Sequence, residues 1–587
     1  MYRYQSEHAL LCLHQVLPDK LSSIWIDAIC IDQQNDTEKG SQLKRMHEIY
    51  AGAQSVIVWL GPLPAIPNSS ALISRFEDVA RRVAHSFPGI DGVAFNDRML
   101  ELSDGNAAKW ENFHLIKEIP SDSWLAVREL AHNGYFRRQW IWQEVIASTA
   151  DPVVVCGAHV LSSWQALRKA SHTLLLFGET ILIRAGASEP RPDYATEGMP
   201  TVNLPHQLAN IRDQYCLHGQ PHMLGKFGHL VLWQNRNSYM CWDERDRLYA
   251  MVGLCGFRRL EDWDYSRPFK ELYVHFWCDV LRRTKDVNYL TYVEDAAARR
   301  YRPRMSRDPD GGSYDAELPS WVPDLRAPLE PTSMWAFYGP CEWMNISKGL
   351  PERKNIGENE PIHGIVVDEG RGRLKLDGYL LDTIQASAQS PTEILQLIRD
   401  ILKDPWTEED PHGGALDAIW YSMTFLTKRD VDASQGITED MAVKSHSWLL
   451  HDRDFAPDCS ILEMLEKKKL LEEVQELDTK NLVFPSPGQT YRPLGMHNTA
   501  AVAWGMKRLR LFRTREHWIG KGPESLQVGD EVWIIPGAEV GFVLRPLYGP
   551  PGDRTRALMG QAYIHGAMGG ELCEVLARRG PAEVVLV

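Results

Sequence analysis

The segment from Ile24 to Gly61 constrains the fold of this chain more than any other stretch. Ile24–Ile29 is almost entirely apolar, as is typical of a strand buried on both faces of a sheet. A helix can begin at Asp36 or Thr37, either of which can serve as its N-cap, and a second apolar run, Val56–Leu60, follows. A strand, a helix and a second strand form the unit from which parallel sheets are built. The segment therefore predicts an α/β domain with a parallel sheet.

A carboxylate interrupts the first apolar run at Asp27, and a polar turn follows it. In open α/β sheets, ligands bind at the carboxyl ends of strands. A buried carboxylate is costly unless it finds a hydrogen-bond partner, so Asp27 is expected either to hold the Gln33–Asp36 turn or to contact a ligand. Ligand contact and local capping are likewise the alternatives for three polar residues nearby, Asp32, Gln33 and Glu38.

Composition narrows the class of protein. The chain has 587 residues, more than one hydrophobic core usually organises, so two to four domains are expected. The formal net charge of −14 argues against nucleic-acid binding, which requires a basic face. The ten cysteines include no CxxC pair, which favours a reduced compartment without a metal site, and Cys30 is expected in the core. Without an apolar run of ~20 residues or a secretory pattern, we expect a cytoplasmic protein with no membrane span.

Four regions separate along the chain. Residues 1–185 alternate predicted strands and helices, and residues 206–325 are predicted to be mostly helical. Residues 326–490 are predicted to be mixed α/β, with a hairpin from Gly364 to Leu376. Residues 495–587 alternate apolar and polar positions between glycine turns, which indicates a small antiparallel module resembling a β-barrel.

Within the first region, further elements are expected after the opening segment. One helix is predicted to begin at Ser121 and to stop in a left-handed turn at Asn133–Gly134. A second helix is predicted at Trp140–Ala147. A short buried strand at Val153–Gly157 and a helix from Ser163–Trp164 continue the alternation.

Several segments resemble the signature segments of one known family. The first is Ile24–Gly61, with WIDAICIDQ before the helix and VIVWLG at its end. The others are GYFRRQWIWQEVIAS at 134–148, DRLYAMVGL at 246–254, LPSWVPD at 318–324 and GQAYIHGAMGGE at 560–571. Together they resemble the HET (heterokaryon incompatibility) domain proteins of filamentous fungi, and the resemblance touches most of the chain.

The resemblance implies both a fold and a chemistry. HET domains are thought to be related to TIR domains, many of which cleave NAD+ between nicotinamide and ribose, so a TIR-like or flavodoxin-like parallel sheet is expected. The catalytic glutamate of the TIR pattern corresponds to Glu144 in this sequence. If NAD+ binds beside Glu144, Trp142 and Trp140 could stack on its rings, and Arg138 and Arg137 could hold its pyrophosphate. Asp27 and Gln33, at the end of the predicted strand, are the other candidate contacts. NAD+ would be a substrate, and the implied role is non-self recognition that triggers regulated cell death.

One carboxylate is chemically sufficient for this reaction. Nicotinamide leaves as a neutral molecule from a cationic ring, so its departure needs no general acid, unlike that of an ordinary glycoside. The remaining task is to stabilise an oxocarbenium-like ribose and to orient a water molecule, which one anion near C1′ can do. From the residues alone, Glu144 can equally form an ion pair with Arg137 or Arg138, and Trp140 can belong to the core.

The chain departs from the family pattern at its N-terminus. HET domains usually begin with a strand that ends in a Ser-Tyr-x-Trp-Gly-like turn, and no such pattern precedes Ile24. In a flavodoxin-like sheet that strand lies in the middle, so we expect either a sequence truncated upstream of Met1 or the loss of part of the pocket. The alternative function is therefore a catalytically inactive, TIR-like module that binds protein partners or assembles with itself.

Overall fold

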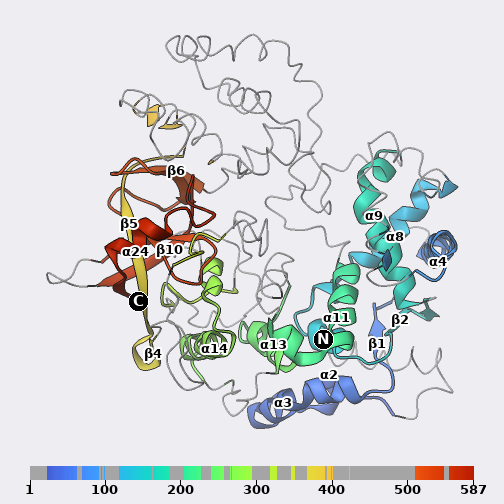
Figure 1. Cartoon of the computed structure of the whole chain (residues 1–587). Helices are drawn as coiled ribbons and strands as arrows, with labels where there is room; N and C mark the ends of the chain where they lie inside the picture. The colour runs from blue at the N-terminus through green and yellow to red at the C-terminus, as the bar shows by residue number, and fades with distance from the viewer. Residues whose placement is uncertain are drawn as a thin grey trace, which may run out of the picture.

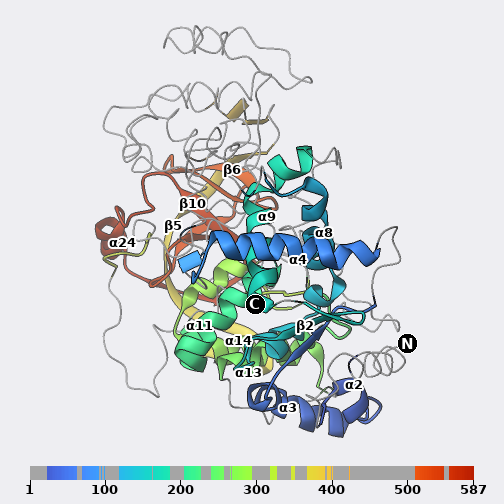
Figure 2. The same ribbon diagram turned by 90° about the vertical axis from the view of Figure 1, so that its right-hand side faces the viewer.

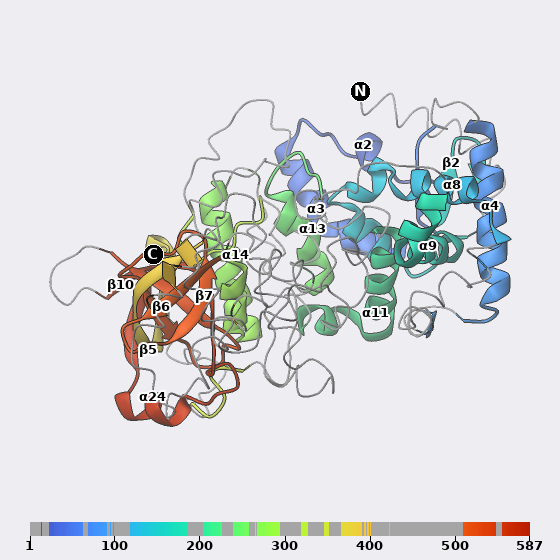
Figure 3. The same cartoon turned by 90° about the horizontal axis from the view of Figure 1, so that it is seen from above.

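The computed structural model describes residues 23–62, 69–90, 118–161, 163–184, 204–225, 239–256, 267–293, 318–326, 345–350, 366–389, 509–547 and 554–587, with a few single residues between them. An N-terminal α/β region and a C-terminal sheet lie on opposite sides of a set of helices (Figure 1). α13 (Asp246–Cys255) and α14 (Phe269–Thr284) lie between the two parts, and the view from above shows the same order (Figure 3).

The N-terminal sheet contains one parallel pair. β1 (Ile57–Trp59) runs parallel to β2 (Val153–Cys156), which pairs antiparallel with β3 (His159–Val160). The valines at the centre of this pairing, Val58 and Val154, are almost completely buried. The strands predicted at Val56–Leu60 and Val153–Gly157 are therefore confirmed.

The strand predicted at Ile24–Ile29 is wrong. Its first three residues are not part of a helix or strand, but Asp27–Cys30 forms one helical turn, α2. The Asp27 carboxylate accepts the N–H of Ala28 (2.8 Å), and the carbonyl of Ile26 accepts the N–H of Cys30 (2.8 Å). These local bonds satisfy the backbone without a neighbouring strand. Cys30 is exposed, so its expected place in the core is also wrong.

Helices pack around the small sheet. α3 (Asp36–Gly52) is capped by Asn35, whose side chain accepts the N–H of Glu38, so it starts one residue from the prediction. α4 (Ser69–Ser86), α8 (Ser121–Ala131) and α9 (Trp164–Arg184) pack against one another (Figure 2). The helices predicted from Ser121 and from Ser163–Trp164 are thereby confirmed.

Two local predictions between α8 and β2 need correction. Asn133 does not form a left-handed stop but begins a 3-10 turn, η1 (Gly134–Arg137). Its amide donates to the carbonyl of Leu60 (2.7 Å), which ties this turn to the end of β1. The helix predicted at Trp140–Ala147 is a π-helical turn, η2 (Trp142–Ile146). Such turns are rare and occur frequently at functional sites.

The middle region is helical, as predicted. α11 (Leu204–Gly225) packs against α9, η2 and α13, so it joins this region to the N-terminal one. α11 is kinked at Gly219, where φ is +70°, two residues before Pro221. The 3-10 helix η5 (Val287–Tyr292) follows α14 and contacts the C-terminal sheet.

The C-terminal sheet is almost entirely antiparallel. Its strands are β5 (Arg373–Ala388), β6 (Leu509–Thr514), β7 (Ile519–Pro523), β8 (Glu531–Ile534), β9 (Gly541–Pro546), β10 (Thr555–Ile564) and β11 (Ala582–Leu586). Starting from β5, the pairings run through β6, β7, β10, β9 and β8 and return to β5, so they form a closed circuit. β11 joins this circuit between β5 and β10, where its pairing with β10 is parallel.

β5 belongs to this sheet although its sequence lies in the region 326–490. The hairpin predicted there is confirmed, because β4 (Val366–Asp368) pairs antiparallel with the start of β5. β5 continues for sixteen residues and contacts β6, β8 and β11. The other helices predicted for the mixed region fall on residues 390–508, most of which lie outside the described residues.

The segment 318–324 fastens the middle helices to this sheet. The N–H of Ser320 donates to the carbonyl of Val587 (2.7 Å), and the buried Trp321 donates its indole N–H to the carbonyl of Gly372 (2.9 Å). From α14, the Trp277 indole donates to a carbonyl of the same segment (3.2 Å). Residues 318–324 thus form hydrogen bonds both with α14 and with residues next to strands β5 and β11.

We predict that Gly520→Ala destabilises the C-terminal sheet by about 3 kcal/mol or more, because overpacking is costly where backbone cannot move. A Cβ at this position would lie 2.1 Å from the carbonyl oxygen of Tyr563 and 2.6 Å from the Phe512 ring. The control is Gly52→Ala at the end of α3, where nothing lies within 4 Å of the added Cβ. Urea unfolding measures both, and equal stability of the two variants would contradict the packing described.

Candidate functional site

Glu144 lies on η2, which both local and long-range bonds hold in place. The carbonyl of Trp140 accepts the N–H groups of Gln143 (3.0 Å) and Glu144 (3.2 Å). The fully buried Gln143 donates its side-chain amide to the carbonyl of Tyr249 on α13 (2.8 Å). Because η2 is fastened at these points, the position of Glu144 depends on helices of the middle region.

Two side chains engage both carboxylate oxygens of Glu144. The hydroxyl of Tyr135 donates to Oε2 (2.8 Å). The Arg138 guanidinium reaches Oε1 through Nη2 (3.0 Å) and Oε2 through Nη1 (3.3 Å). The side chain of Glu144 is only 8% exposed, whereas that of Arg138 is 43% exposed. The ion pair therefore joins a buried carboxylate to an arginine whose side chain is partly exposed.

The charges around Glu144 act in opposite directions on its acidity. Burial raises the pKa of Glu144; the Arg138 charge opposes this effect and the nearby Asp27 charge adds to it. Burial also raises the pKa of Tyr135, as do the charge of Glu144 and the hydrogen bond between the two side chains. The hydroxyl of Tyr135 thus stays protonated and able to donate at neutral pH.

Asp27, Tyr50 and Trp25 complete this group of side chains. Burial raises the pKa of Tyr50 strongly, and the charges of Glu144 and Asp27 raise it further. The rings of Trp25 and Tyr50 meet edge to face, with centroids 5.7 Å apart. We call the set Trp25, Asp27, Tyr50, Tyr135, Arg138 and Glu144 the Glu144 cluster. It brings together three of the five site residues predicted from sequence.

Gln33 lies beside the cluster but points to its backbone. Its amide donates to the carbonyl oxygen of Asp27 (3.0 Å), and its side chain is exposed. Asp32 and Glu38 are linked locally, because the N–H of Asp32 donates to the Glu38 carboxylate (3.2 Å). These hydrogen bonds correspond to the alternative in which the polar residues of the turn bond to one another and not to a ligand. Gln33 joins the turn to α2 through the carbonyl of Asp27.

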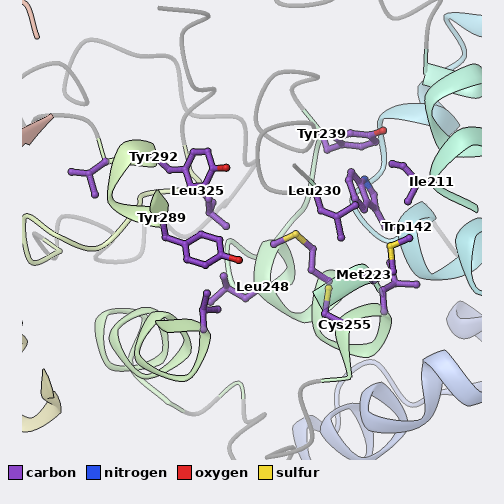
Figure 4. Packing of buried hydrophobic residues seen from close by; sticks show 14 of the residues in the cluster. Trp142, Ile211, Met223, Leu230, Tyr239, Leu248, Cys255, Tyr289, Tyr292 and Leu325 are labelled. Carbon is purple, nitrogen blue, oxygen red and sulfur yellow. The ribbon is translucent and has the colours of Figure 1, made fainter. Parts of the chain in front are cut away.

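Trp142 lies away from the cluster, in the core. It is fully buried and meets the ring of Tyr239 edge to face, with centroids 5.5 Å apart. Figure 4 shows it beside Tyr239, Leu230 and Ile211. Trp142 thus packs η2 against the middle region, whereas Trp140 remains partly buried at the edge of the core.

Sequence reasoning missed the aromatic members of the cluster. Tyr135 stands in the same segment as Glu144 but has no spacing that marks it as a partner. Tyr50 shares one face of α3 with the apolar Leu43 and Met46, so its spacing indicates core packing and not a site. Trp25 was assigned to a strand that does not form. Only their joint position around Glu144 reveals them.

A second buried carboxylate, Asp246, lies at the start of α13. Tyr265 donates its hydroxyl to Oδ1 of Asp246 (2.6 Å), and Lys39 of α3 lies over the Tyr265 ring, 3.9 Å from its centroid. Burial raises the pKa of Asp246 to about 6, although the hydrogen bonds from Tyr265 and Trp140 and the Lys39 charge oppose the shift. Tyr265 thus contacts both helices, α13 through Asp246 and α3 through Lys39, and holds them together.

The backbone of Arg138 is also fastened to the middle region. The N–H of Gln139 donates to the carbonyl of Met240 (2.8 Å), and the N–H of Met240 donates to the carbonyl of Arg137 (2.5 Å). Arg212 of α11 donates to the Ser148 carbonyl (3.2 Å) on the other side of η2. The residues around Glu144 are therefore held on one side by Met240 and on the other by Arg212 of α11, both outside the first region.

Two searches of the described residues gave negative results. No group of three or more His, Cys, Asp or Glu side chains is placed to hold a metal ion within the described ranges. No helix in the described part of the chain is long and apolar enough to cross a membrane.

Comparison with known proteins identifies two domains. Residues 4–144 match the family model of the heterokaryon incompatibility protein (HET) domain, and residues 488–581 match that of the Het-6 beta-barrel domain. In these two segments the chain is similar to HET-domain proteins. "Heterokaryon incompatibility protein 6, OR allele" of Neurospora crassa is 23% identical to it over 603 residues, which cover 94% of this chain and 82% of that one. No solved structure matches.

The boundaries of the HET match bear on the site. The match ends at Glu144, so every member of the Glu144 cluster lies inside the HET domain. Its supports, Met240 and Tyr249, lie outside the domain. Sequence comparison alone would therefore separate the site from the helices that position it.

We predict that Asp246→Asn raises the stability of this protein above pH 6 and leaves it unchanged near pH 4. The pKa of Asp246 rises from 3.8 to about 6 on folding, so the folded state holds this proton more tightly. The stability that it contributes is complete below pH 3.8 and is lost as pH rises through about 6, at about 1.4 kcal/mol per unit, or ~3 kcal/mol in total.

Urea unfolding from pH 4 to pH 8 measures this difference. The control is Asp122→Asn, which removes a carboxylate that is 52% exposed and paired with Arg75 (3.0 Å). Such surface pairs contribute about 0–1 kcal/mol, so the control should follow the wild-type pH profile. If Asp246→Asn were destabilising at pH 8, the account of Asp246 as a carboxylate that burial disfavours would be wrong.

Proposed function

We propose that this protein acts in heterokaryon incompatibility as a non-self recognition protein that triggers regulated cell death, with NAD+ hydrolysis at Glu144 as its chemistry. The HET match and the name of the Neurospora relative support the biological role. One observation carries the chemical part. A nearly buried carboxylate on a fixed π-helical turn lies beside an arginine whose side chain is partly exposed.

In the proposed reaction the C1′–N bond of NAD+ breaks, and its electron pair passes to the ring nitrogen. Nicotinamide therefore leaves as a neutral molecule and needs no proton from an acid. A water oxygen bonds to C1′, and the Glu144 carboxylate accepts the proton that this water loses. The products are nicotinamide, ADP-ribose and one proton, which Glu144 releases to solvent.

The other members of the cluster take distinct roles in this proposal. Asp27 adds a second negative charge, which favours the positive charge that develops on the ribose. Trp25 and Tyr50 supply aromatic surface for the cationic nicotinamide ring. Arg138 supplies donors for the diphosphate, and Gln33 steadies the Asp27 backbone. Trp142 supports η2 from the core, so in this proposal the ring contact falls to Trp25.

We also infer that the closed circuit of strands is the barrel to which the second family model refers. The match covers residues 488–581, which contain β6 to β10. β5 closes the circuit between β6 and β8 from outside the matched residues. The proposed barrel therefore draws one strand from earlier in the chain. The N-terminal domain is proposed to be TIR-like, with the parallel β1–β2 pair as part of its sheet.

A catalytically inactive interaction module is the alternative function. The observation that favours it is the engagement of both Glu144 oxygens by Tyr135 and Arg138, as in an ion pair with a purely structural role. In that case the cluster would hold a surface that binds protein partners, and no residue in it would act on NAD+.

The deciding variant is Glu144→Gln. We expect wild-type protein to consume NAD+, and we expect Glu144→Gln to lower the rate by about 10²-fold or more, the usual contribution of a general base. The matched control is Glu129→Gln on α8, whose side chain is 43% exposed and which should retain wild-type activity. NAD+ and nicotinamide are quantified with purified full-length chain and after expression in cells. Equal consumption by wild type and Glu144→Gln would exclude the proposed chemistry.

A further inference from the structure

The ion pair between Glu144 and Arg138 sets a requirement that any ligand of this cluster must meet. Oε1 of Glu144 is bound by Arg138, and Oε2 is bound by both Arg138 and Tyr135. About three of the four acceptor positions of this carboxylate are therefore occupied, and the adjacent guanidinium charge repels a cationic carbon that approaches it. Arg138 must therefore move away before Glu144 can act.

Moving Arg138 away leaves a buried negative charge without its partner. Removing one member of a buried ion pair is strongly unfavourable because the remaining charge is uncompensated. Asp27 makes this worse, since its charge already disfavours the ionised form of Glu144. A ligand can displace Arg138 only if it brings a positive group to replace it.

The guanidinium likewise needs a new partner. Its side chain is 43% exposed, so part of it lies in reach of an anion from solvent. Arginine binds phosphate oxygens with two parallel hydrogen bonds, which match the two that it makes to Glu144. The Tyr135 ring lies 5.4 Å from the guanidinium carbon and offers it a surface along which to move.

We propose that Arg138 is a specificity-determining latch, which holds Glu144 inactive in the empty site and transfers to a phosphate of the ligand. The ligand class that this selects is a small molecule with both a cationic ring and a phosphate. Such a ligand exchanges the internal ion pair for two new ones, ring to Glu144 and phosphate to Arg138. Tyr135 keeps its hydrogen bond to Oε2 and holds the carboxylate in place. This inference rests on the proposed hydrolysis of NAD+, whose charges fit the class.

The first test compares two substrates that differ only in the phosphate, nicotinamide mononucleotide and nicotinamide riboside. We expect the wild-type full-length chain to cleave the mononucleotide with a kcat/KM higher by ~10-fold or more, since one well-placed ion pair of ~1.4 kcal/mol corresponds to tenfold. Arg138→Met removes both the latch and the phosphate contact, so the two substrates should become equivalent. Inorganic pyrophosphate should activate riboside cleavage by wild type and leave Arg138→Met unaffected.

Two further variants control for structure. Arg75→Met removes an arginine that is 41% exposed and paired with Asp122, so it matches Arg138 in exposure and should keep wild-type discrimination. Arg138→Lys retains the charge but loses the bidentate geometry, and it should discriminate to an intermediate degree. It also provides a folded variant if Arg138→Met is unstable.

A binding measurement separates the latch from the chemistry. Pyrophosphate is titrated into wild type, Arg138→Met and Arg138→Lys in the presence of 1-methylnicotinamide, an uncleavable cationic ring that can replace Arg138 beside Glu144, and calorimetry reports the affinity. If no substrate is cleaved but pyrophosphate binding depends on Arg138, the hydrolysis proposal fails and the anion-binding role of Arg138 stands. If wild type cleaves both nicotinamide substrates equally and pyrophosphate has no effect, the latch is refuted while the hydrolysis proposal survives. Pyrophosphate affinity that is unchanged by Arg138→Met also refutes the latch.

Discussion

The buried hydrogen bond from the Gln143 amide to the Tyr249 carbonyl is the contact on which the site depends most. It is 2.8 Å long, and Gln143 is fully buried, so water cannot replace either partner. The bond fixes η2 against α13. Gly253, on the same helix, has no space for a side chain, because a Cβ there would lie 2.8 Å from the Cβ of His47 and 3.1 Å from the Gln143 amide. A glycine is therefore required where α3, η2 and α13 meet. The segments at 134–148 and 246–254, which appear unrelated in sequence, are two sides of this contact.

The sequence allowed prediction of elements whose signals are local and consistent. The strand at β1, the helix α3 and the strand at β2 have apolar patterns that only one structure satisfies, and they were located to within about two residues. Ile24–Ile29 has an equally apolar pattern, but Asp27 can accept a backbone N–H and start a helical turn. A period-two or continuous apolar pattern cannot report whether a neighbouring strand is available. That information belongs to tertiary structure, which is why the prediction failed there.

The site was also predictable only where the signal is local in the sequence. Glu144 was found by its place in a segment, and its ion pair with Arg138 was one of the alternatives left open by the residues. Tyr135 was not found, because a tyrosine that donates to a carboxylate has no characteristic spacing. Tyr50 was not found, because its place on the apolar face of α3 predicts only core packing. The reach of β5 into the C-terminal sheet was missed on similar grounds: its pairing partners lie more than a hundred residues away in sequence. Contacts between distant segments determine both features.

The charge balance of the cluster explains how one ion pair can be compatible with both structure and chemistry. Two carboxylates, Asp27 and Glu144, lie near one guanidinium, and burial raises the pKa of Glu144. The Arg138 charge lowers this pKa and so favours the ionised form that a general base requires. Its pairing would nevertheless block the base if it were permanent. A ligand with charges of both signs resolves the conflict, because each separated partner regains an opposite charge as the ion pair opens. A neutral or purely anionic ligand would leave Glu144 buried without a positive partner. The charges of the cluster would therefore select among ligands independently of the shape of the pocket.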